Sequence, residues 1–264
     1  FGLGTVNYTP FLTAPEPDAP AYVTDVEISP DTTLGIQTAT FDVKFNREMD
    51  QSIQPQIDFQ SILHETWSTF ITSNSGIPGN EITAIAAAAD GSIWVGTAGF
   101  GAAHYDNKDW TVYTTSNSGL MGDYVFSIEV AADGSIWFGD MNGVSRFNGS
   151  QWTQYTHTPS GTFLSTVADI ASAPDGSLWF GTFGSGAIHF DGSNWTEYNS
   201  SNSGIPQNTI RTLTVTNKNV TWFGFGNLHC KPVSYDGTSW IEYQIDDLAC
   251  IDDIAPAQDG SVWF

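Results

Sequence analysis

The sequence predicts an all-β protein, a β-propeller of four-stranded blades, because one tryptophan-containing phrase recurs along it at a nearly constant interval. The phrase is Asp90-Gly-Ser-Ile-Trp94 in its first copy, and later copies keep the tryptophan in the same place, at Trp137, Trp179, Trp222 and Trp263. The steps between successive tryptophans are 43, 42, 43 and 41 residues. A period in the low forties with strand-like content is typical of a propeller, in which each repeat folds into one blade.

Three further phrases repeat with this period and place four short strands in every repeat. A second tryptophan is followed three residues later by another aromatic residue, at Trp67, Trp110, Trp152, Trp195 and Trp240. A phrase ending in an aromatic residue lies between the two tryptophan series, at Tyr105, Phe147, Phe190 and Tyr235. Two aliphatic residues three positions apart, such as Ile82 and Ile85, precede each first tryptophan. In the first complete repeat we therefore expect strands around Ile85, Trp94, Tyr105 and Trp110.

The connections between the expected strands carry their own signals. Asp-Gly separates the first strand from the second, and Asn148-Gly149, Asp191-Gly192 and Asp236-Gly237 separate the third from the fourth. Such pairs predict two-residue hairpins, because both central positions of that turn favour φ > 0. The link between the second and third strands is longer and glycine-rich. The link from one repeat to the next carries Ser-Asn-Ser-Gly, at residues 73–76, 116–119 and 201–204.

The two tryptophans of each repeat are interpreted as packing residues. A buried aromatic ring removes on the order of 150–250 Å² from water, so two per blade can hold neighbouring sheets face to face. The alternative is a ring of platforms on which sugars stack, but a residue kept at one strand position in every repeat favours packing. The aspartate of Asp-Gly-Ser is likewise interpreted as a turn residue rather than a metal ligand.

The strand count predicts an open arc of about four and a half blades rather than a closed ring. A lone strand of the fourth type, at residues 67–70, precedes four full repeats, and a first strand and part of a second follow them. We expect the partners of the early strand to lie beyond Phe264, and exposed sheet edges at both ends of the arc. On this interpretation the chain is an internal piece of a longer protein.

The chain is expected to divide into three parts. Residues 1–20 contain four prolines and predict an extended linker; residues 3–10 within it resemble the exit of a parallel β-helix. Residues 21–62 predict part of a small Ig-like β-sandwich, because apolar residues alternate there and because the phrase at 43–50 resembles one that recurs in Ig-like modules of bacterial surface proteins. Residues 63–264 predict the incomplete propeller.

The composition argues against two classes of partner. Seven basic residues stand against 29 acidic ones, which gives a formal net charge of −22. Nucleic acid and anionic lipid both require clustered Lys and Arg, so we expect neither to bind. Cations, cationic ligands and neutral sugars remain compatible with this charge, and solubility alone would also explain it. No apolar run approaches the roughly 20 residues of a membrane helix, so we expect no membrane insertion within this sequence.

The sequence lacks the common catalytic motifs. It contains neither the Gly-x-Ser-x-Gly elbow nor His-Glu-x-x-His, and residues 181–186 are interpreted as a glycine-rich turn because no helix follows them. His104 and His189 occupy equivalent third-strand positions two repeats apart and are interpreted as structural. Asp246-Asp247 and Asp252-Asp253 could bind Ca²⁺, but a solvated acidic loop is favoured. We therefore expect no metal and no cofactor.

The two cysteines predict a disulfide. Because strands alternate in direction, the links between second and third strands and the links between repeats leave the blades on one face. Cys230 belongs to the first kind of link and Cys250 follows the next link of the second kind, on the adjacent blade. The bridge would suit an oxidising compartment, and it requires Cα atoms closer than about 7 Å.

That same face is the candidate binding surface, since residues there vary between repeats while the frame stays constant. Ordinary loop drift would explain the variation equally well. The heads of the first strands contribute Glu81, Tyr124, Thr166, Thr209 and Arg211. The links between second and third strands contribute Phe100, Met141, Phe183 and His229.

The ordered set of phrases over residues 65–264 closely resembles the two-component-regulator propeller repeat. That resemblance implies an extracytoplasmic module, which in this family often senses ligands, commonly carbohydrate, for a membrane-bound kinase, and which also occurs in secreted multidomain proteins. The Ig-like piece favours the second setting. The phrase Asp-Gly-x-Ile-Trp-Phe is also similar to streptogramin lyase, a propeller enzyme, but that family lacks the regular second tryptophan and its catalytic residues do not map onto this sequence.

The leading hypothesis is therefore a non-catalytic binding or interaction module of a secreted or surface-bound bacterial protein, located extracellularly, on the cell surface or in the periplasm. Glycans, peptides and neighbouring domains are the expected partners. A propeller lyase is the alternative, and a cluster of His and carboxylate side chains at the channel mouth would favour it. A plain spacer without a binding site is a third hypothesis.

Overall fold

The computed structural model describes residues 23–29, 40–45, 68–162, 164–226, 231–245 and 250–264. The chain forms two compact units, residues 1–68 and 69–264, which are described separately. In the first unit, β1 (Val23–Ser29) and β2 (Thr40–Phe45) pair antiparallel. Both segments are strands, as the alternating pattern predicts. The Ig-like module to which they were assigned stays a prediction, and the predicted linker at 1–20 lies outside the described residues.

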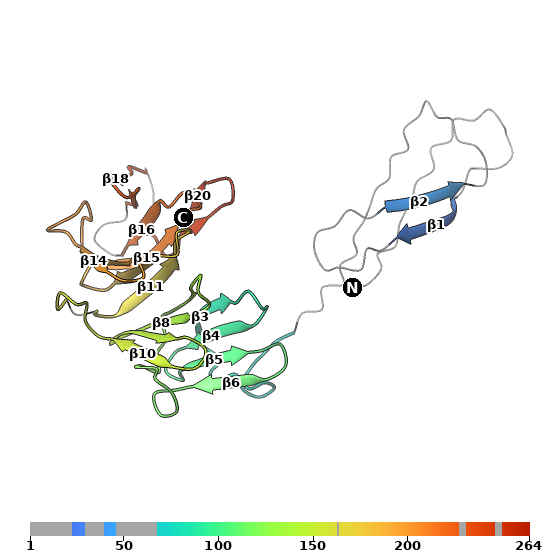
Figure 1. Cartoon of the computed structure of the whole chain (residues 1–264), viewed down its shortest axis with the longest axis horizontal. Helices are drawn as coiled ribbons and strands as arrows, with labels where there is room; N and C mark the ends of the chain where they lie inside the picture. The colour runs from blue at the N-terminus through green and yellow to red at the C-terminus, as the bar shows by residue number, and fades with distance from the viewer. Residues whose placement is uncertain (1–22, 30–39, 46–67, 163, 227–230, 246–249) are drawn as a thin grey trace. The chain divides into compact units, whose positions relative to one another are not determined.

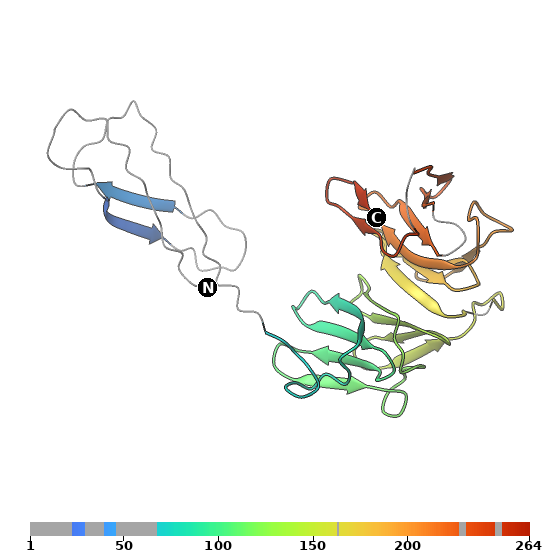
Figure 2. The same ribbon diagram turned by 180° about the vertical axis from the view of Figure 1, so that it is seen from behind.

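The second unit contains four four-stranded antiparallel sheets in chain order, which we call blades one to four (Figures 1 and 2). Blade one comprises β3 (Ile82–Ala87), β4 (Ile93–Thr97), β5 (Ala102–Tyr105) and β6 (Trp110–Tyr113). Blade two comprises β7 (Ser127–Val130), β8 (Ile136–Asp140), β9 (Gly143–Phe147) and β10 (Trp152–Tyr155). Blade three comprises β11 (Val167–Ser172), β12 (Leu178–Thr182), β13 (Ala187–Phe190) and β14 (Trp195–Tyr198). Blade four comprises β15 (Ile210–Val215), β16 (Thr221–Phe225), β17 (Val233–Tyr235) and β18 (Trp240–Glu242).

A fifth blade begins with β19 (Ala255–Pro256) and β20 (Val262–Trp263). The first strands β3, β7, β11 and β15 contact one another from blade to blade, so they lie innermost in the arc. The part of the chain that the structure describes contains strands and turns but no helix. The predicted fold class, an all-β open propeller, is therefore confirmed.

The tight turns form where the Asp-Gly pairs predict them. In the turn between β3 and β4, the Asp90 carboxylate accepts a hydrogen bond from the backbone N–H of Ser92 at 2.9 Å, and Gly91 has φ of 83°. A side chain at that φ would be strained, which explains the glycine. The Asp133 and Asp175 turns repeat the aspartate–serine hydrogen bond at 2.9 Å. These aspartates act as turn residues, as expected.

The tryptophans of the second strands pack the blades together. Trp94, Trp137 and Trp179 are almost fully buried, and each belongs to a core that includes apolar residues of the following blade. The ring of Trp94 lies 5.6 Å from that of Phe138 on the next blade, and the two later pairs, Trp137–Phe180 and Trp179–Phe223, repeat the distance. The packing interpretation of this series is confirmed, because rings so enclosed leave no face on which a sugar could stack.

The second tryptophan series explains the Ser-Asn-Ser-Gly links. A Cβ placed on Gly119 would lie 2.2 Å from the Cβ of Trp152, and Gly76 and Gly204 meet Trp110 and Trp240 in the same way at 2.5 and 2.3 Å. The preceding asparagine closes the link: Asn117 accepts from the N–H of Thr114 and donates to a carbonyl of β6. The glycine of each link thus packs directly against the second tryptophan of the following blade.

The two ends of the arc are open, as predicted (Figure 1). Ile85 on β3 is 69% exposed, whereas its equivalents on later blades, such as Ile128 at 6% and Ile170 at 4%, are covered by the preceding blade. At the other end Trp263 on β20 is 70% exposed. Blade one and the beginning of the fifth blade therefore each present an uncovered face.

Candidate functional site

The arc has two distinct faces because its strands alternate in direction. We call the face with the links between second and third strands and the links between blades the loop face, and the face with the tight Asp-Gly and Asn-Gly turns the hairpin face. The prediction of a longer link between second and third strands is wrong for blade two, where β8 and β9 pair up to Asp140 and Gly143 and only Met141-Asn142 joins them. On the loop face, Ala98 pairs with Tyr124 of the next blade, and Phe183 pairs with Thr209 in the same way. The backbone therefore ties each of these links to the head of the following inner strand.

Further backbone hydrogen bonds make this part of the loop face a fixed frame. The N–H of Gly101 donates to the carbonyl of Asp123 at 2.7 Å, and those of Gly184 and Gly186 both donate to Asn208 at 2.9 Å. In blade three the N–H of Phe183 also donates to the carbonyl of Thr166. The predicted residues Thr166, Phe183 and Thr209 are thus brought together.

Three of the predicted residues project from this frame as large apolar side chains. Phe100 in blade one is 56% exposed, Met141 in blade two 57% and Phe183 in blade three 44%. Each lies in the link between the second and third strands of its blade, so three consecutive blades each present one. We call Phe100, Met141 and Phe183 the apolar tips.

An aromatic residue that was not predicted, Phe126, lies beside one of these tips, Phe183. The ring of Phe126 is 4.6 Å from that of Tyr124 and 6.5 Å from that of Phe183. Phe126 follows the buried Val125 at the head of the inner strand, a position that Thr83 and Ala168 fill in the neighbouring blades. That departure from the repeat is the signal that could have identified it.

Three predicted residues remain: Glu81, Arg211 and His229. Glu81 is exposed, and its backbone carbonyl accepts from Ala98 within its own blade. Arg211 pairs with Asp252 of the fifth blade at 2.8 Å, so its charge is largely offset. His229 lies outside the described residues. So does Cys230, and its disulfide with Cys250 therefore stays a prediction; the described residues include no free thiol.

Carboxylates on the inner strands connect the blades rather than gather into a reactive site. Asp169 accepts from its neighbour Ile170 and, across the interface, from the N–H of Leu213 at 2.8 Å. Enclosure between the blades raises the pKa of Asp169 to about 7, and the nearby Asp253 acts in the same direction. Burial also raises the pKa of Glu129, which accepts from the N–H and hydroxyl of Ser172 on the next blade. Through these hydrogen bonds both carboxylates join neighbouring blades.

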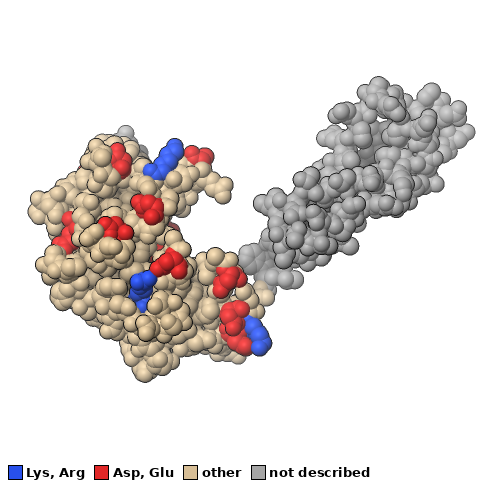
Figure 3. Space-filling model, viewed as in Figure 1, with Lys and Arg blue, Asp and Glu red and all other residues tan. Residues whose placement is uncertain are grey.

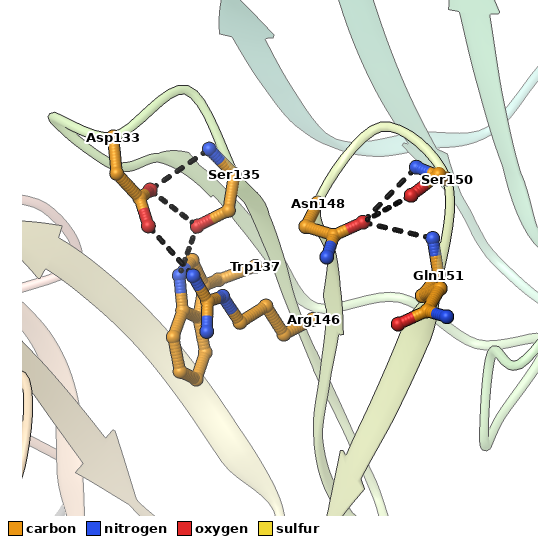
Figure 4. A network of polar contacts seen from close by, with 7 residues as sticks. All are labelled: Asp133, Ser135, Trp137, Arg146, Asn148, Ser150 and Gln151. Carbon is orange, nitrogen blue, oxygen red and sulfur yellow. Dashed lines mark hydrogen bonds and ion pairs between the residues drawn. The ribbon is translucent and has the colours of Figure 1, made fainter.

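The hairpin face carries a polar network on blade two (Figure 4). Asp133 accepts from Arg146 at 2.6 Å and from Ser135, whose hydroxyl in turn accepts from the indole N–H of Trp137 at 3.0 Å. The Arg146 guanidinium stands 5.4 Å from the centre of the Trp137 ring. A cavity of about 400 Å³ opens beside this network, with Leu178 and Phe190 in its walls. Nothing in the sequence predicted this cavity.

Arg146 fills the slot that histidine occupies in blades one and three. His104 stacks on Trp94 with ring centres 4.3 Å apart, and His189 lies 4.5 Å from Trp179. Burial lowers the pKa of His189 despite the neighbouring carboxylates Asp175 and Asp191. These histidines cover tryptophan rings on separate blades, which agrees with their structural interpretation.

Within the described ranges, no group of three or more His, Cys, Asp or Glu side chains could hold a metal ion. Of the acidic pairs considered for Ca²⁺, Asp246-Asp247 lies outside those ranges. Asp252 pairs with Arg211, and Asp253 accepts from the hydroxyl of Thr212 and the N–H of Ile254.

The described part of the chain contains no helix long and apolar enough to cross a membrane. Acidic side chains outnumber basic ones on the face of the propeller in Figure 3.

Comparison with known proteins agrees with this architecture. Residues 76–99 match the two component regulator propeller family, which confirms the predicted resemblance for that repeat. No curated protein sequence matches the chain. Among solved structures, the chain is similar to the extracellular domain described as that of the hybrid two component system BT3049 from B. thetaiotaomicron. That similarity has a TM-score of 0.58 and 21% identity, and it covers 69% of this chain and 25% of that one.

Two further structures show the same fold in other settings. A streptogramin B lyase is 22% identical with a TM-score of 0.56, covering 69% of this chain and 61% of that one. The protein YCF48, solved bound to D1 peptide, is 13% identical with a TM-score of 0.51, covering 69% and 59%. The chain thus spans about a quarter of the regulator domain it resembles. Likeness at these identities establishes the propeller fold, and the chain carries a two-component-regulator propeller repeat within it.

Proposed function

We propose that the propeller is a non-catalytic binding or interaction module of a larger secreted or surface-exposed bacterial protein, and that its loop face is the binding surface. The observation that carries the proposal is the set of apolar tips, one on each of three consecutive blades, two of them on links that backbone hydrogen bonds fix to the next blade. Exposed apolar side chains on a rigid frame are typical of recognition surfaces. The likeness to an extracellular regulator domain supports a location outside the cytoplasm.

Glycans, peptides and neighbouring domains of the same protein are the partner classes proposed. The regulator likeness supports a sensing role, with carbohydrate as one ligand class. The likeness to YCF48 supports peptide binding, since that propeller was solved with a peptide bound. The acidic composition, 29 acidic against seven basic residues, argues against nucleic acid in every case.

The test is a binding screen of the whole chain against glycan and peptide arrays, repeated with Phe183→Ser. The proposal predicts that ligands found with the parent chain are lost or weakened with the variant. Asp191→Asn on the hairpin face is the matched control, because its exposed carboxylate lies on the opposite side of the blade. Hits that survive Phe183→Ser but disappear with Asp191→Asn would contradict the proposal.

A lyase is the second candidate, because the streptogramin B lyase shares the fold over two thirds of this chain. Such chemistry would need acid–base groups gathered at the channel mouth. In the described part of the inner strands, the perturbed carboxylates are already engaged between blades, as Asp169 and Glu129 show. Turnover of a streptogramin B substrate by the purified chain, with and without added divalent metal, would favour this candidate, and its failure would favour the binding module.

A further inference from the structure

The cavity beside Arg146 is lined by residues of blades two and three at the hairpin face. Its most buried lining residues are apolar: Ala131, Trp137 and Leu178 are at most 8% exposed. Arg146 and Phe190 also line it and are partly exposed. Its volume of about 400 Å³ lies within the usual range of small-molecule sites, roughly 300–1,000 Å³. The cavity can therefore hold one small molecule that has an apolar part.

One ion pair supplies the charged groups of the cavity. The guanidinium of Arg146 donates to a carboxylate oxygen of Asp133 at 2.6 Å (Figure 4). Of the five N–H groups of an arginine, Asp133 thus takes one, and the Nε–H of Arg146 is enclosed without a partner among the described residues. The other carboxylate oxygen of Asp133 accepts from Ser135. The outer end of Arg146 can therefore donate to a ligand, and the oxygen of Asp133 that it contacts can accept from one.

The charge around the cavity is mixed, with an excess of negative charge. Asp133 lines it directly, and Asp175 and Asp191 immediately precede the lining residues Gly176 and Gly192. Hydrogen bonds lower the pKa of both these aspartates, that of Asp191 to about 2, so both are ionised at neutral pH. Three carboxylates therefore surround a single guanidinium.

This combination disfavours most classes of small ligand. A simple anion would be repelled by the carboxylates, and a simple cation would be repelled by Arg146. A sugar would leave most of its hydroxyl groups against apolar walls without hydrogen-bond partners, which costs free energy. A zwitterion avoids these costs, because its carboxylate can bond to Arg146 while its ammonium group bonds to Asp133. An α-amino acid carries both groups on one carbon, so together they can reach two partners that are themselves in contact.

We propose that this cavity binds a free apolar α-amino acid. Its carboxylate bonds to Arg146, its ammonium group bonds to Asp133, and its side chain packs against Leu178 and Phe190. The inference goes beyond the proposed function and does not depend on it, because this site takes a small molecule on the hairpin face and the proposed partner binds the loop face.

Arg146 restricts the site to blade two among the first three blades. The equivalent slot holds His104 in blade one and His189 in blade three. Burial lowers the pKa of His189, which keeps its ring neutral at neutral pH. A neutral imidazole offers one N–H donor and no charge, whereas a guanidinium bonds to a carboxylate through a charge-assisted fork. The histidine blades therefore lack the group that would hold the carboxylate of an amino acid.

The experiment is isothermal titration calorimetry of the whole chain with L-leucine. Arg146→His introduces the residue of blades one and three, and Asp133→Asn keeps an oxygen that can accept from Ser135, as Asn148 accepts from Ser150 in another turn. Each variant is expected to raise Kd roughly tenfold or more, because a hydrogen bond between charged groups is lost. Asp90→Asn makes the same change in the equivalent turn of blade one. It is the matched control and should leave Kd unchanged.

A series of ligands tests the three contacts without any substitution in the protein. N-acetyl-L-leucine lacks the ammonium group, L-leucinamide lacks the carboxylate and glycine lacks the side chain, so each should bind more weakly than L-leucine. The inference would be overturned if L-leucine gave no heat of binding, or if any of these analogues bound as tightly. An equal loss of affinity in Asp90→Asn and Arg146→His would also overturn it, as would a loss in the loop-face variant Phe183→Ser.

Discussion

Single glycines set the distance between each link and the next blade. Gly119 lies directly under Trp152, where a Cβ would stand 2.2 Å from the Cβ of the tryptophan. No side chain fits at that distance, so the tryptophan or the link must shift. The requirement explains why the tetrapeptide Ser-Asn-Ser-Gly ends in glycine.

Gly119→Ala is therefore expected to lower the free energy of unfolding by about 1–3 kcal/mol, the usual effect of overpacking a filled site. Urea denaturation followed by tryptophan fluorescence measures the change. Gly226→Ala is the matched control, because the nearest atom to its added Cβ lies 3.9 Å away. Equal stability of the two variants would show that the close approach at Gly119 is not real.

A single residue, Asp169, makes the free energy of unfolding depend on pH. Its folded-state pKa of about 7 lies above the ordinary value of 3.8, mainly because of burial. The folded state therefore binds the Asp169 proton more tightly than the unfolded state does. The contribution of Asp169 to the free energy of unfolding is accordingly greatest at low pH and is lost as pH rises from about 4 to 7. The loss would be at most about 4 kcal/mol. Glu129, whose pKa burial also raises, acts in the same direction.

Asp169→Asn is expected to flatten the decline in stability between pH 5 and pH 8, because the amide does not titrate. The measurement is urea denaturation of parent and variant at both pH values. Asp191→Asn is the control: hydrogen bonds from Asn194 and Ser193 lower the Asp191 pKa to about 2, so Asp191 stays ionised across this range. An unchanged slope in Asp169→Asn would contradict the enclosure of that carboxylate.

At the scale of elements, the links between blades are built from side-chain hydrogen bonds. In the link after blade one, Asn117 accepts from Thr114 at 2.7 Å and donates to Val112 at 3.0 Å. The link after blade two lacks the tetrapeptide, and there the hydroxyls of Thr158, Ser160 and Thr162 donate to Glu197 instead. Two different sequences thus solve the same problem of joining one blade to the next.

Asn117→Ala removes both hydrogen bonds of the first kind of link and is expected to cost about 1 kcal/mol of stability, since the groups are solvent-exposed and water replaces part of the loss. Thermal unfolding monitored by circular dichroism measures it. Ser116→Ala, one residue earlier, removes one exposed contact with Thr114 and should change stability much less. A larger effect at Ser116 than at Asn117 would contradict this account of the link.

The elements were predictable from sequence because each is specified by neighbours in the chain. The recurring tryptophans, the Asp-Gly turns and the glycine after Ser-Asn-Ser all act within a repeat or between consecutive repeats. The cavity beside Arg146 and the hydroxyl cluster on Glu197 could not be predicted in this way. Each depends on side chains from two blades that meet only after the sheets have packed.

At the scale of the whole unit, the open arc leaves the same position covered in some blades and uncovered in another. Ile85 is 69% exposed, whereas its equivalent Ile128 is 6% exposed beneath blade one. Ile128→Asp is expected to destabilise the fold by several kcal/mol because it buries an unpaired charge. Ile85→Asp should change stability by about 0.5 kcal/mol or less. Denaturant titrations of both variants test the arc, and a large loss at Ile85 would indicate that its face is covered.

The central claim is that the loop face, not the hairpin face, meets the partner. Hydrogen–deuterium exchange of the whole chain, with and without a ligand obtained from the binding screen, tests it most directly. The account predicts slower exchange in the links at residues 98–101, 141–142 and 183–186, with no change in the turns around Gly134, Gly176 and Gly192. Protection confined to those turns, beside the cavity at Arg146, would contradict it.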